Sequence, residues 1–276
     1  MVALEPARLA NDERTPPARR TRGPVRWRAL TLTVVAAYFL VPLYAALRFA
    51  LEDNNGHFSW TPLTAIASQP GLGAALWLSA RLAVVTTLIT VVVMVPTVLH
   101  VHLHLARFRR VMEVITTLPL VIPPIVLILG VLHAAPLWLK ASPYLLSLVY
   151  VILAMPFVYR SLDAGLSALE LTTLVEAARS LGSSWRSTLW RVLLPNLRGA
   201  LLSAVVLTVA LVLGEFTMAS LDLWETVPVW IVNFSQNDAH VSTAVAMVSL
   251  LATWLLLTLI VSLDRSQRRR PGGPRS

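Results

Sequence analysis

Long apolar runs separated by short polar stretches dominate this sequence. A helix that crosses a bilayer needs about 20 mainly apolar residues, and six runs meet that requirement. They lie at about residues 27–50, 72–99, 111–134, 143–162, 197–221 and 241–263. The pattern predicts an all-α integral membrane protein with six transmembrane helices in one domain, residues 26–263. A basic tail at residues 1–25, which we expect to be disordered, and a basic tail at 264–276 flank it.

The third run contains three prolines, Pro119, Pro123 and Pro124. Proline removes a backbone hydrogen bond, and a break in a membrane helix is tolerated where it faces protein or a water-lined cavity. Two interpretations stay open at this point: a helix that lines a translocation pathway, or a kink that serves only packing.

Composition supports the membrane interpretation. Hydrophobic residues make up 56% of the chain and charged residues 13%, against about 25% charged in a typical soluble domain. The net charge of +9 could indicate a nucleic-acid partner in a soluble protein. Here the positive charges cluster in loops and tails, so we expect a lipid bilayer as the partner and no nucleic acid. The sequence has no cysteine, which excludes disulfides, cysteine-ligated zinc and iron–sulfur clusters.

The positive charges also predict the orientation. All but three of the 23 lysines and arginines lie in the N-terminal tail, the loop before the third run, the region around residues 160–198 or the C-terminal tail. The exceptions are Arg48, Arg81 and Lys140. Cytoplasmic loops are enriched in lysine and arginine, so we expect both termini and the 176–195 region in the cytoplasm of a prokaryote, beneath its inner (plasma) membrane.

Three histidines alternate at the end of the second run: His100, His102 and His104. A spacing of two turns a helical side chain by about 200°, so His102 should point away from the other two. The remaining pair falls short of the three or four ligands of a zinc site. We therefore expect an interfacial histidine cluster and no metal site.

One polar stretch, Glu176–Pro195, interrupts the apolar chain between the fourth and fifth runs. Apolar residues recur at helical spacing before and within it, which predicts a helix, a turn near Gly182 and a second short helix. Gly182 can take a positive φ, and Pro195 suits the first turn of a helix. Trp185 and Arg186 are of the types enriched in binding hot spots; anchoring of Trp185 at the headgroup level is the alternative.

The stretch resembles the signature of ABC importer permeases. That signature is Glu-Ala-Ala, three residues, Gly, nine residues, Ile, any residue, Leu-Pro. Here it is formed by Glu176-Ala177-Ala178, Gly182 and Val192-Leu193-Leu194-Pro195, with Val192 where isoleucine is usual. The resemblance covers about residues 72–262. The end of the fifth run, Leu213–Leu221, is similar to permeases that import polyamines, ferric iron, thiamine or sulfate.

The resemblance implies a type I ABC importer permease fold with a cytoplasmic coupling helix. The implied partners are ATPase subunits that bind ATP and magnesium, a second permease subunit of the same or a different chain, and a solute-binding protein at the outer face. The cargo it suggests is a small polar solute such as a polyamine. The residues expected at the ATPase contact are Glu176, Ala177, Ala178, Arg179, Gly182, Trp185, Arg186 and Pro195. Those expected at the pathway or its gate are Pro123, Pro124, Gly214, Glu215 and Thr217.

The chain carries no chemistry for hydrolysing ATP itself. A P-loop needs Gly-Lys-Ser/Thr, and the only lysine, Lys140, follows Leu139. We therefore expect a non-catalytic subunit without a cofactor of its own. A stand-alone secondary transporter or channel is the alternative, although it would need intramembrane ionisable residues, of which Glu215 is the main candidate. A membrane-embedded enzyme is a third possibility, but no catalytic constellation lies at a common depth.

Overall fold

The computed structural model describes residues 25–53, 55–169 and 171–268. Apart from an isolated bridge between Glu52 and Phe58, these residues form helices and connecting turns. The chain divides into two units, residues 1–45 and 46–276. The tail predicted at residues 1–25 lies almost wholly outside the described residues, as do residues 269–276 of the second tail.

Among the described residues, four helices are long and apolar enough to cross a membrane. They coincide with four of the predicted runs and extend beyond them at one or both ends. They are α1 (Val25–Ala50), α3 (Leu72–His104), α7 (Tyr144–Ser167) and α14 (Ala239–Arg268). Two bent helix pairs would raise the count of spans to six if each pair is one span, which agrees with the six-helix prediction.

The third run is broken in two. It forms α4 (Arg109–Val121) and α5 (Pro124–Ala134), which meet at 98°. Ile122 and Pro123 between them have extended ψ values of 121° and 135°. A residue before proline is pushed out of the helical region and a proline cannot donate a backbone bond, so the two adjacent prolines explain the break. Pro119 stays inside α4.

The fifth run, predicted as one helix over 197–221, is also interrupted. Its long part is α11 (Arg198–Gly214), which ends at Glu215, where ψ is 121°. The short helix α12 (Thr217–Leu221) follows. The polar segment before α11 bends by 72° from it. The prediction of a continuous fifth helix was therefore wrong.

The remaining helices are short. On the outer side of the predicted topology they are α2 (Thr61–Ala65), η1 (Ile66–Ser68), α6 (Leu137–Lys140) and α13 (Val227–Phe234). On the other side they are η2 (Ala106–Phe108), α8 (Leu171–Ser180), α9 (Trp185–Thr188), the π-helical turn η3 (Leu189–Leu193) and α10 (Leu194–Asn196).

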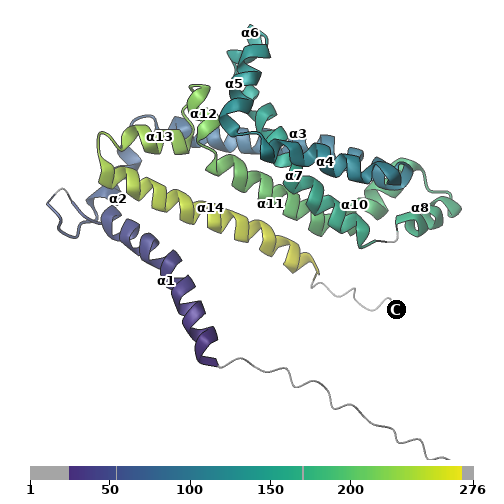
Figure 1. Ribbon diagram of the computed structural model, residues 1–276, viewed down its shortest axis with the longest axis horizontal. Coiled ribbons are helices and arrows are strands. Elements are labelled where there is room, and N and C mark those ends of the chain that lie inside the picture. The colour runs from purple at the N-terminus through teal and green to yellow at the C-terminus, as the bar shows by residue number, and fades with distance from the viewer. Residues whose placement is uncertain (1–24, 54, 170, 269–276) are drawn as a thin grey trace, which may run out of the picture. The chain divides into compact units, whose positions relative to one another are not determined.

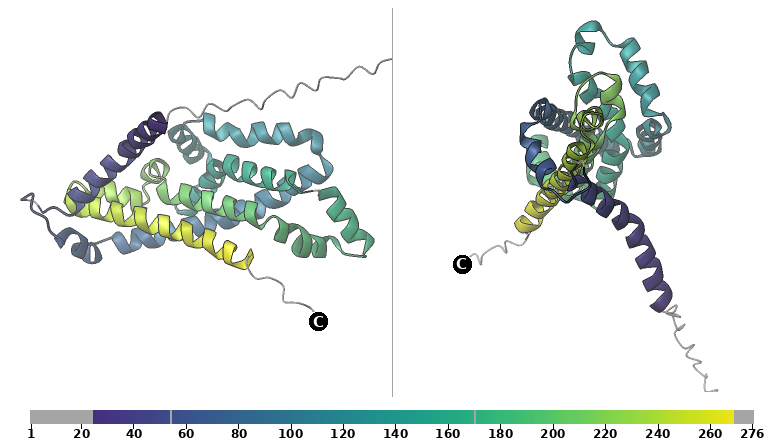
Figure 2. Two further views of the ribbon diagram at one scale, coloured as in Figure 1. Left: turned by 90° about the horizontal axis from the view of Figure 1, so that it is seen from below. Right: turned by 90° about the vertical axis from the view of Figure 1, so that its left-hand side faces the viewer.

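Within residues 46–276, α3, α7 and α11 pack against one another, and α14 runs alongside α11 (Figure 1, Figure 2). Three apolar clusters fill the described part of this unit, and the third joins α3, α13 and α14. The first core cluster joins α3, α7 and α11 to the polar segment, and its buried members include Val98, Leu162, Leu171, Leu193 and Leu197. The second core cluster joins the same helices to α5, α12 and α13.

Candidate functional site

The turn after α8 is fixed by the backbone. Gly182 has a φ of +77°, as the sequence predicted. Its N–H donates to the Arg179 carbonyl at 2.9 Å, and the N–H of Ser183 donates to the Ala178 carbonyl at 3.0 Å. This pair of bonds is a Schellman motif, which satisfies the last carbonyls of a helix when a residue in the left-handed region follows it. Gly182 therefore ends α8 and turns the chain into the next helix.

The second helix of the segment begins at a cap. The Ser184 side chain accepts a bond from the Ser187 N–H, as serine does at helix starts. One turn later the helix widens, and the Leu194 N–H donates to the Leu189 carbonyl, five residues back. Pro195 follows directly and has no N–H to donate. The proline lies at the start of α10, as predicted, and the π turn before it is of a kind frequent at functional sites.

Most of the residues expected at the ATPase contact are exposed. Glu176, Ala177 and Arg179 face outward on α8, and Trp185 is 49% exposed. Ala178 is different, because it is buried and faces the chain's own interior, so of the two alanines only Ala177 offers surface to a partner. Among the described residues Glu176 forms no ion pair, and Leu181, from the predicted apolar face, is 88% exposed.

The inner face of the segment is packed into the bundle. Leu171 at the start of α8 and Leu193 before α10 are buried members of the first core cluster, with Leu189 and Leu194 packed against it. The same cluster contains the inner parts of α3, α7 and α11. The segment is therefore attached to three long helices through apolar contacts, while its outer face stays available.

The three histidines lie as predicted. The rings of His100 and His104 are 5.0 Å apart and exposed, whereas His102 faces Asp163 on α7. No group of three or more metal-ligating residues was found in the described part of the chain. His100 and His104 also line a groove of about 590 Å³ together with Trp185 and Leu189, so one side of Trp185 faces α3.

The residues expected at the pathway lie at the two helix breaks. Pro123 caps α5 and Pro124 begins it, and both are exposed. Gly214 ends α11, with no atom within 4 Å of where a Cβ would lie. The Glu215 carboxylate accepts the Met218 N–H at 2.9 Å and the Tyr150 hydroxyl at 3.4 Å. Thr217, half-buried, is the first residue of α12.

These contacts assign Glu215 a definite local role. Its carboxylate faces the bundle, as predicted, and accepts a backbone bond from the first turn of α12, where a negative charge is favourable. Tyr150, which donates the other bond, is fully buried in the second core cluster. Glu215 therefore stabilises the break between α11 and α12. This role was not predicted from the sequence, because the fifth run was predicted to be one continuous helix.

Asp222, just after α12, is a second carboxyl group at this end. Its Oδ2 is buried and has no hydrogen-bond partner among the described residues. Burial penalises the charged form and raises the pKa of Asp222 to about 6. Asp53, in the loop after α1, shows the opposite case. Its carboxylate accepts the backbone N–H groups of His57 and Asn55 at 2.9 Å each, which lowers its pKa.

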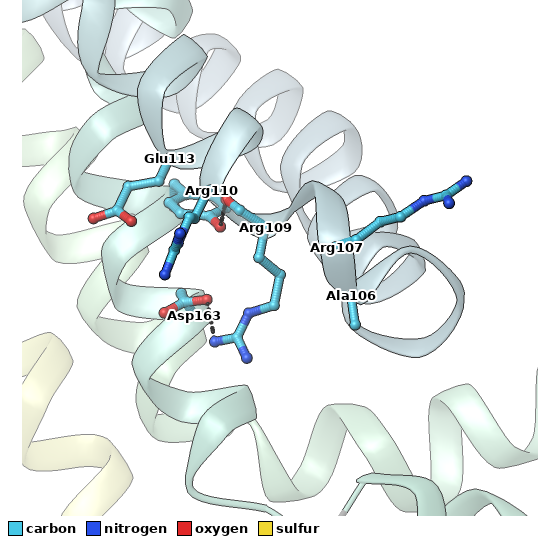
Figure 3. A pocket seen from close by; sticks show the side chains of 7 residues that line it. Ala106, Arg107, Arg109, Arg110, Glu113 and Asp163 are labelled. Carbon is cyan, nitrogen blue, oxygen red and sulfur yellow. Dashed lines mark hydrogen bonds and ion pairs between the residues drawn. The ribbon is translucent and has the colours of Figure 1, made fainter.

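A polar contact between α4 and α7 was not predicted from the sequence. Arg109, the first residue of α4, donates through Nη2 to Asp163 Oδ1 at 2.9 Å (Figure 3). The same nitrogen donates to Ser167 Oγ at 2.8 Å. The Tyr159 hydroxyl donates to the Arg109 carbonyl at 3.0 Å. Arg109, Asp163 and Tyr159 line a pocket of about 460 Å³ with Ala106, Arg107, Arg110 and Glu113.

A sequence signal for this contact did exist. Tyr159, Asp163 and Ser167 are spaced by four, so they form one polar stripe at the end of a mainly apolar helix. The stripe lies at the end of a predicted span, close to a loop with three arginines. Polar side chains in that arrangement indicate a partner on a neighbouring helix, because an unpaired polar group at membrane depth is costly.

The sequence is also similar to those of known proteins. Residues 71–271 match the family described as "Binding-protein-dependent transport system inner membrane component". A protein of Haloferax volcanii named "Probable molybdenum ABC transporter permease protein" is 32% identical over 263 residues, covering 87% of this chain and 94% of the relative. The molybdenum transport system permease protein ModB of Mycobacterium tuberculosis is 29% identical over 205 residues, 69% and 74% of the two chains. The sulfate transport system permease protein CysW of Synechococcus elongatus is 40% identical over 75 residues, 27% and 26% of the two chains.

Proposed function

This chain belongs to the family of binding-protein-dependent transport system inner membrane components, the permease subunits of ABC importers, and we propose that its cargo is molybdate. A permease of this family is a multi-pass inner-membrane protein without catalytic activity or a cofactor of its own. It works with an ATPase, which binds ATP, and with a solute-binding protein. These statements follow from the family. The cargo, the coupling surface and the pathway are proposals.

The cargo proposal rests on the relatives. Two of them, from an archaeon and a mycobacterium, are named for molybdenum and match most of this chain. Molybdenum(VI) in neutral water is a tetrahedral divalent oxyanion, as sulfate is, and a sulfate permease also matches a short part. The expectation of a polyamine finds no support among these relatives. The bonds from Met218 and Tyr150 give Glu215 a role in the fold that needs no cationic cargo.

We propose that the Glu176–Pro195 segment is the surface that docks on the ATPase. The supporting observation is its two-sided construction. The inner face is packed into the core through Leu171 and Leu193, and the outer face presents Glu176, Arg179 and Trp185. A surface of this kind can pass a displacement to the long helices. The distribution of arginines supports its placement in the cytoplasm together with both termini.

We further propose that the helix breaks line the pathway. A bilayer-spanning helix can expose broken backbone only to protein or water. The breaks at Pro123–Pro124 and at Gly214–Glu215 lie on segments that also contact each other, since α5 packs against α12. A second permease subunit would complete the pathway on the exposed side of these breaks, and the solute-binding protein would deliver cargo at the outer face.

Reconstitution tests the cargo and the mechanism together. The permease, its ATPase and its binding protein are placed in vesicles, and uptake of radioactive molybdate is measured with and without ATP. We expect uptake to require all three proteins and ATP, and to be blocked by excess molybdate or tungstate but not by spermidine. Stronger competition by sulfate would assign the chain to sulfate instead. Uptake without ATPase would support the stand-alone transporter and contradict the proposal.

A further inference from the structure

The contact between α4 and α7 lies between the two regions that importer function must connect. Ser167 is the last residue of α7, and α8 of the docking segment begins four residues later at Leu171. Arg109 is the first residue of α4, which leads to the break at Pro123. The polar stripe of α7 therefore joins the base of the docking segment to the beginning of the broken helix.

Asp163 also contacts a third helix. The side chain of His102 on α3 is 4% exposed, and its Nε2 lies 3.1 Å from Asp163 Oδ1. These two atoms lie close to each other but form no hydrogen bond. The other ring nitrogen, Nδ1, lies 3.0 Å from the Val98 carbonyl. Both nitrogens face oxygen acceptors, and the ring is held between its own helix and the carboxylate.

We propose that Asp163 is a positioning residue for coupling, through which a displacement of the docking segment reaches α4 and α3. This inference rests on the proposed docking role of Glu176–Pro195. Among the polar contacts of the described residues, those of Asp163 reach from the stripe to both neighbouring helices, to His102 on α3 and to Arg109 on α4. In this link the Asp163 carboxylate accepts a hydrogen bond from the Arg109 guanidinium and lies next to the His102 imidazole.

Polar contacts between helices have a preferred direction, and apolar contacts do not. Apolar contacts in the first core cluster hold the helices together, but apolar attraction has no preferred direction and permits sliding. Hydrogen bonds weaken steeply with angle and distance. Arg109 is fixed at two points, by its guanidinium on Asp163 and Ser167 and by its carbonyl on Tyr159. The beginning of α4 therefore cannot shift along α7 without breaking these bonds.

The same contact contributes little to stability. The side chains of Arg109 and Asp163 are 40% and 31% exposed, and ion pairs near water are weak. A variant that removes the charge should therefore fold and assemble. Glu113 offers a matched control, because it lines the same pocket, is exposed, and forms no ion pair among the described residues.

The test uses single cysteines in the assembled permease–ATPase complex, since the chain has none of its own. Ser180→Cys reports on the docking segment and Val114→Cys on α4; both residues are exposed. The rate of maleimide labelling is measured with and without a non-hydrolysable ATP analogue. We expect the analogue to change both rates at least threefold in the parent. With Asp163→Asn we expect the change at Ser180→Cys to persist and the change at Val114→Cys to be lost.

The remaining variants make the outcome decisive. Asp163→Glu should restore the response at Val114→Cys, and Glu113→Gln should leave it intact. Arg109→Gln removes the same contact from the other side and replaces Asp163→Asn if that variant does not assemble. A response at Val114→Cys that survives in Asp163→Asn or Arg109→Gln would overturn the inference. Absence of any nucleotide effect at Ser180→Cys in the parent would instead contradict the docking role, and this outcome needs no knowledge of the cargo.

Discussion

At the residue scale, a few side chains and backbone angles determine how the functional regions are built. Gly182 is a clear case. A Cβ added at Gly182 would meet no atom within 4 Å, so this chain leaves space for a side chain there. The φ of +77° nevertheless disfavours residues that are branched at Cβ. Within this chain the cost of a substitution therefore lies in backbone strain, and the proposed docking role would add the loss of space for the ATPase.

Two substitutions separate these contributions. Gly182→Val should destabilise the turn by about 1–2 kcal/mol or more, because an L-residue is strained in the left-handed region, and should reduce ATPase binding or uncouple hydrolysis from uptake. Gly182→Asn keeps the turn, because asparagine tolerates this region, but adds bulk. Co-purification of the ATPase and uptake per ATP hydrolysed are the measurements. Normal values for Gly182→Val would contradict the importance of this turn.

The pKa of Asp222 gives a prediction with a definite sign. The ordinary value is 3.8 and the folded value is about 6, so the folded protein binds this proton more tightly than the unfolded chain. Stability therefore falls as pH rises from about 4 to about 6 and is level above that. Asp222→Asn removes the buried charge, and we expect it to raise Tm by about 2–4 °C at pH 8, with a smaller gain at pH 5.

Asp53 is the matched control for that measurement. Its folded pKa is lowered by the N–H groups of His57 and Asn55, so its contribution is present above its ordinary pKa and is lost only as pH falls below about 4. Asp53→Asn should therefore lower Tm by the same small amount at pH 5 and pH 8. A pH-independent effect of Asp222→Asn would show that its carboxyl group is solvated.

At the scale of elements, the long helices meet at one very close contact. A Cβ placed on Gly165 of α7 would lie 2.5 Å from the Cβ of Ala200 on α11. One turn earlier, the Ser161 hydroxyl donates to the Ala200 carbonyl at 2.9 Å. Small residues at helix contacts allow backbones to approach closely in membranes. This contact fixes α11, and with it the docking segment, against α7.

The contact predicts opposite effects for two glycine substitutions. Gly165→Ala should destabilise the protein by about 1–3 kcal/mol, because the added methyl group overpacks the α7–α11 contact. Gly130→Ala, in α5, adds the same methyl group where no atom lies within 4 Å, and should be neutral or stabilising by up to about 1 kcal/mol. Thermal unfolding of the purified protein measures both. Equal effects would show that α7 and α11 have room to separate.

At the scale of the whole molecule, the orientation in the membrane decides which proteins can dock where. If each bent pair is one span, the described residues form six spans, and an even number would place both termini on one side. We propose from the arginine distribution that this side is the cytoplasm. The loop after α1 and the turn after α8 then face opposite compartments.

Cysteine labelling of intact cells tests this orientation. Asn55→Cys, in the exposed loop after α1, should react with a membrane-impermeant maleimide added outside. Ser180→Cys, at the end of α8, should react only after the membrane is permeabilised. The reverse pattern would invert the topology and would place the Glu176–Pro195 segment out of reach of a cytoplasmic ATPase.

The sequence by itself determined the class of the protein and the local structure of the Glu176–Pro195 segment. Runs of about 20 apolar residues allow little other than membrane helices, and the spacing from Glu176 to Pro195 predicted a helix, a turn at Gly182 and a second helix. All three are present because they depend on local rules: helical periodicity, the φ freedom of glycine and the missing N–H of proline. The family match agrees with the resemblance found in the residues.

Only the tertiary structure decided how these parts are joined. No proline marks the break at Glu215 in the sequence. The Glu215 carboxylate stabilises the break by accepting bonds from the Met218 N–H and from the hydroxyl of Tyr150, which is 65 residues away in the chain. The hydrogen bond between Arg109 and Asp163 joins residues 54 apart in the chain. The burial of Ala178 depends on which part of the bundle α8 packs against. Contacts between distant residues depend on helix register and packing, which a local pattern does not encode, and so the contact between α4 and α7 became visible only in three dimensions.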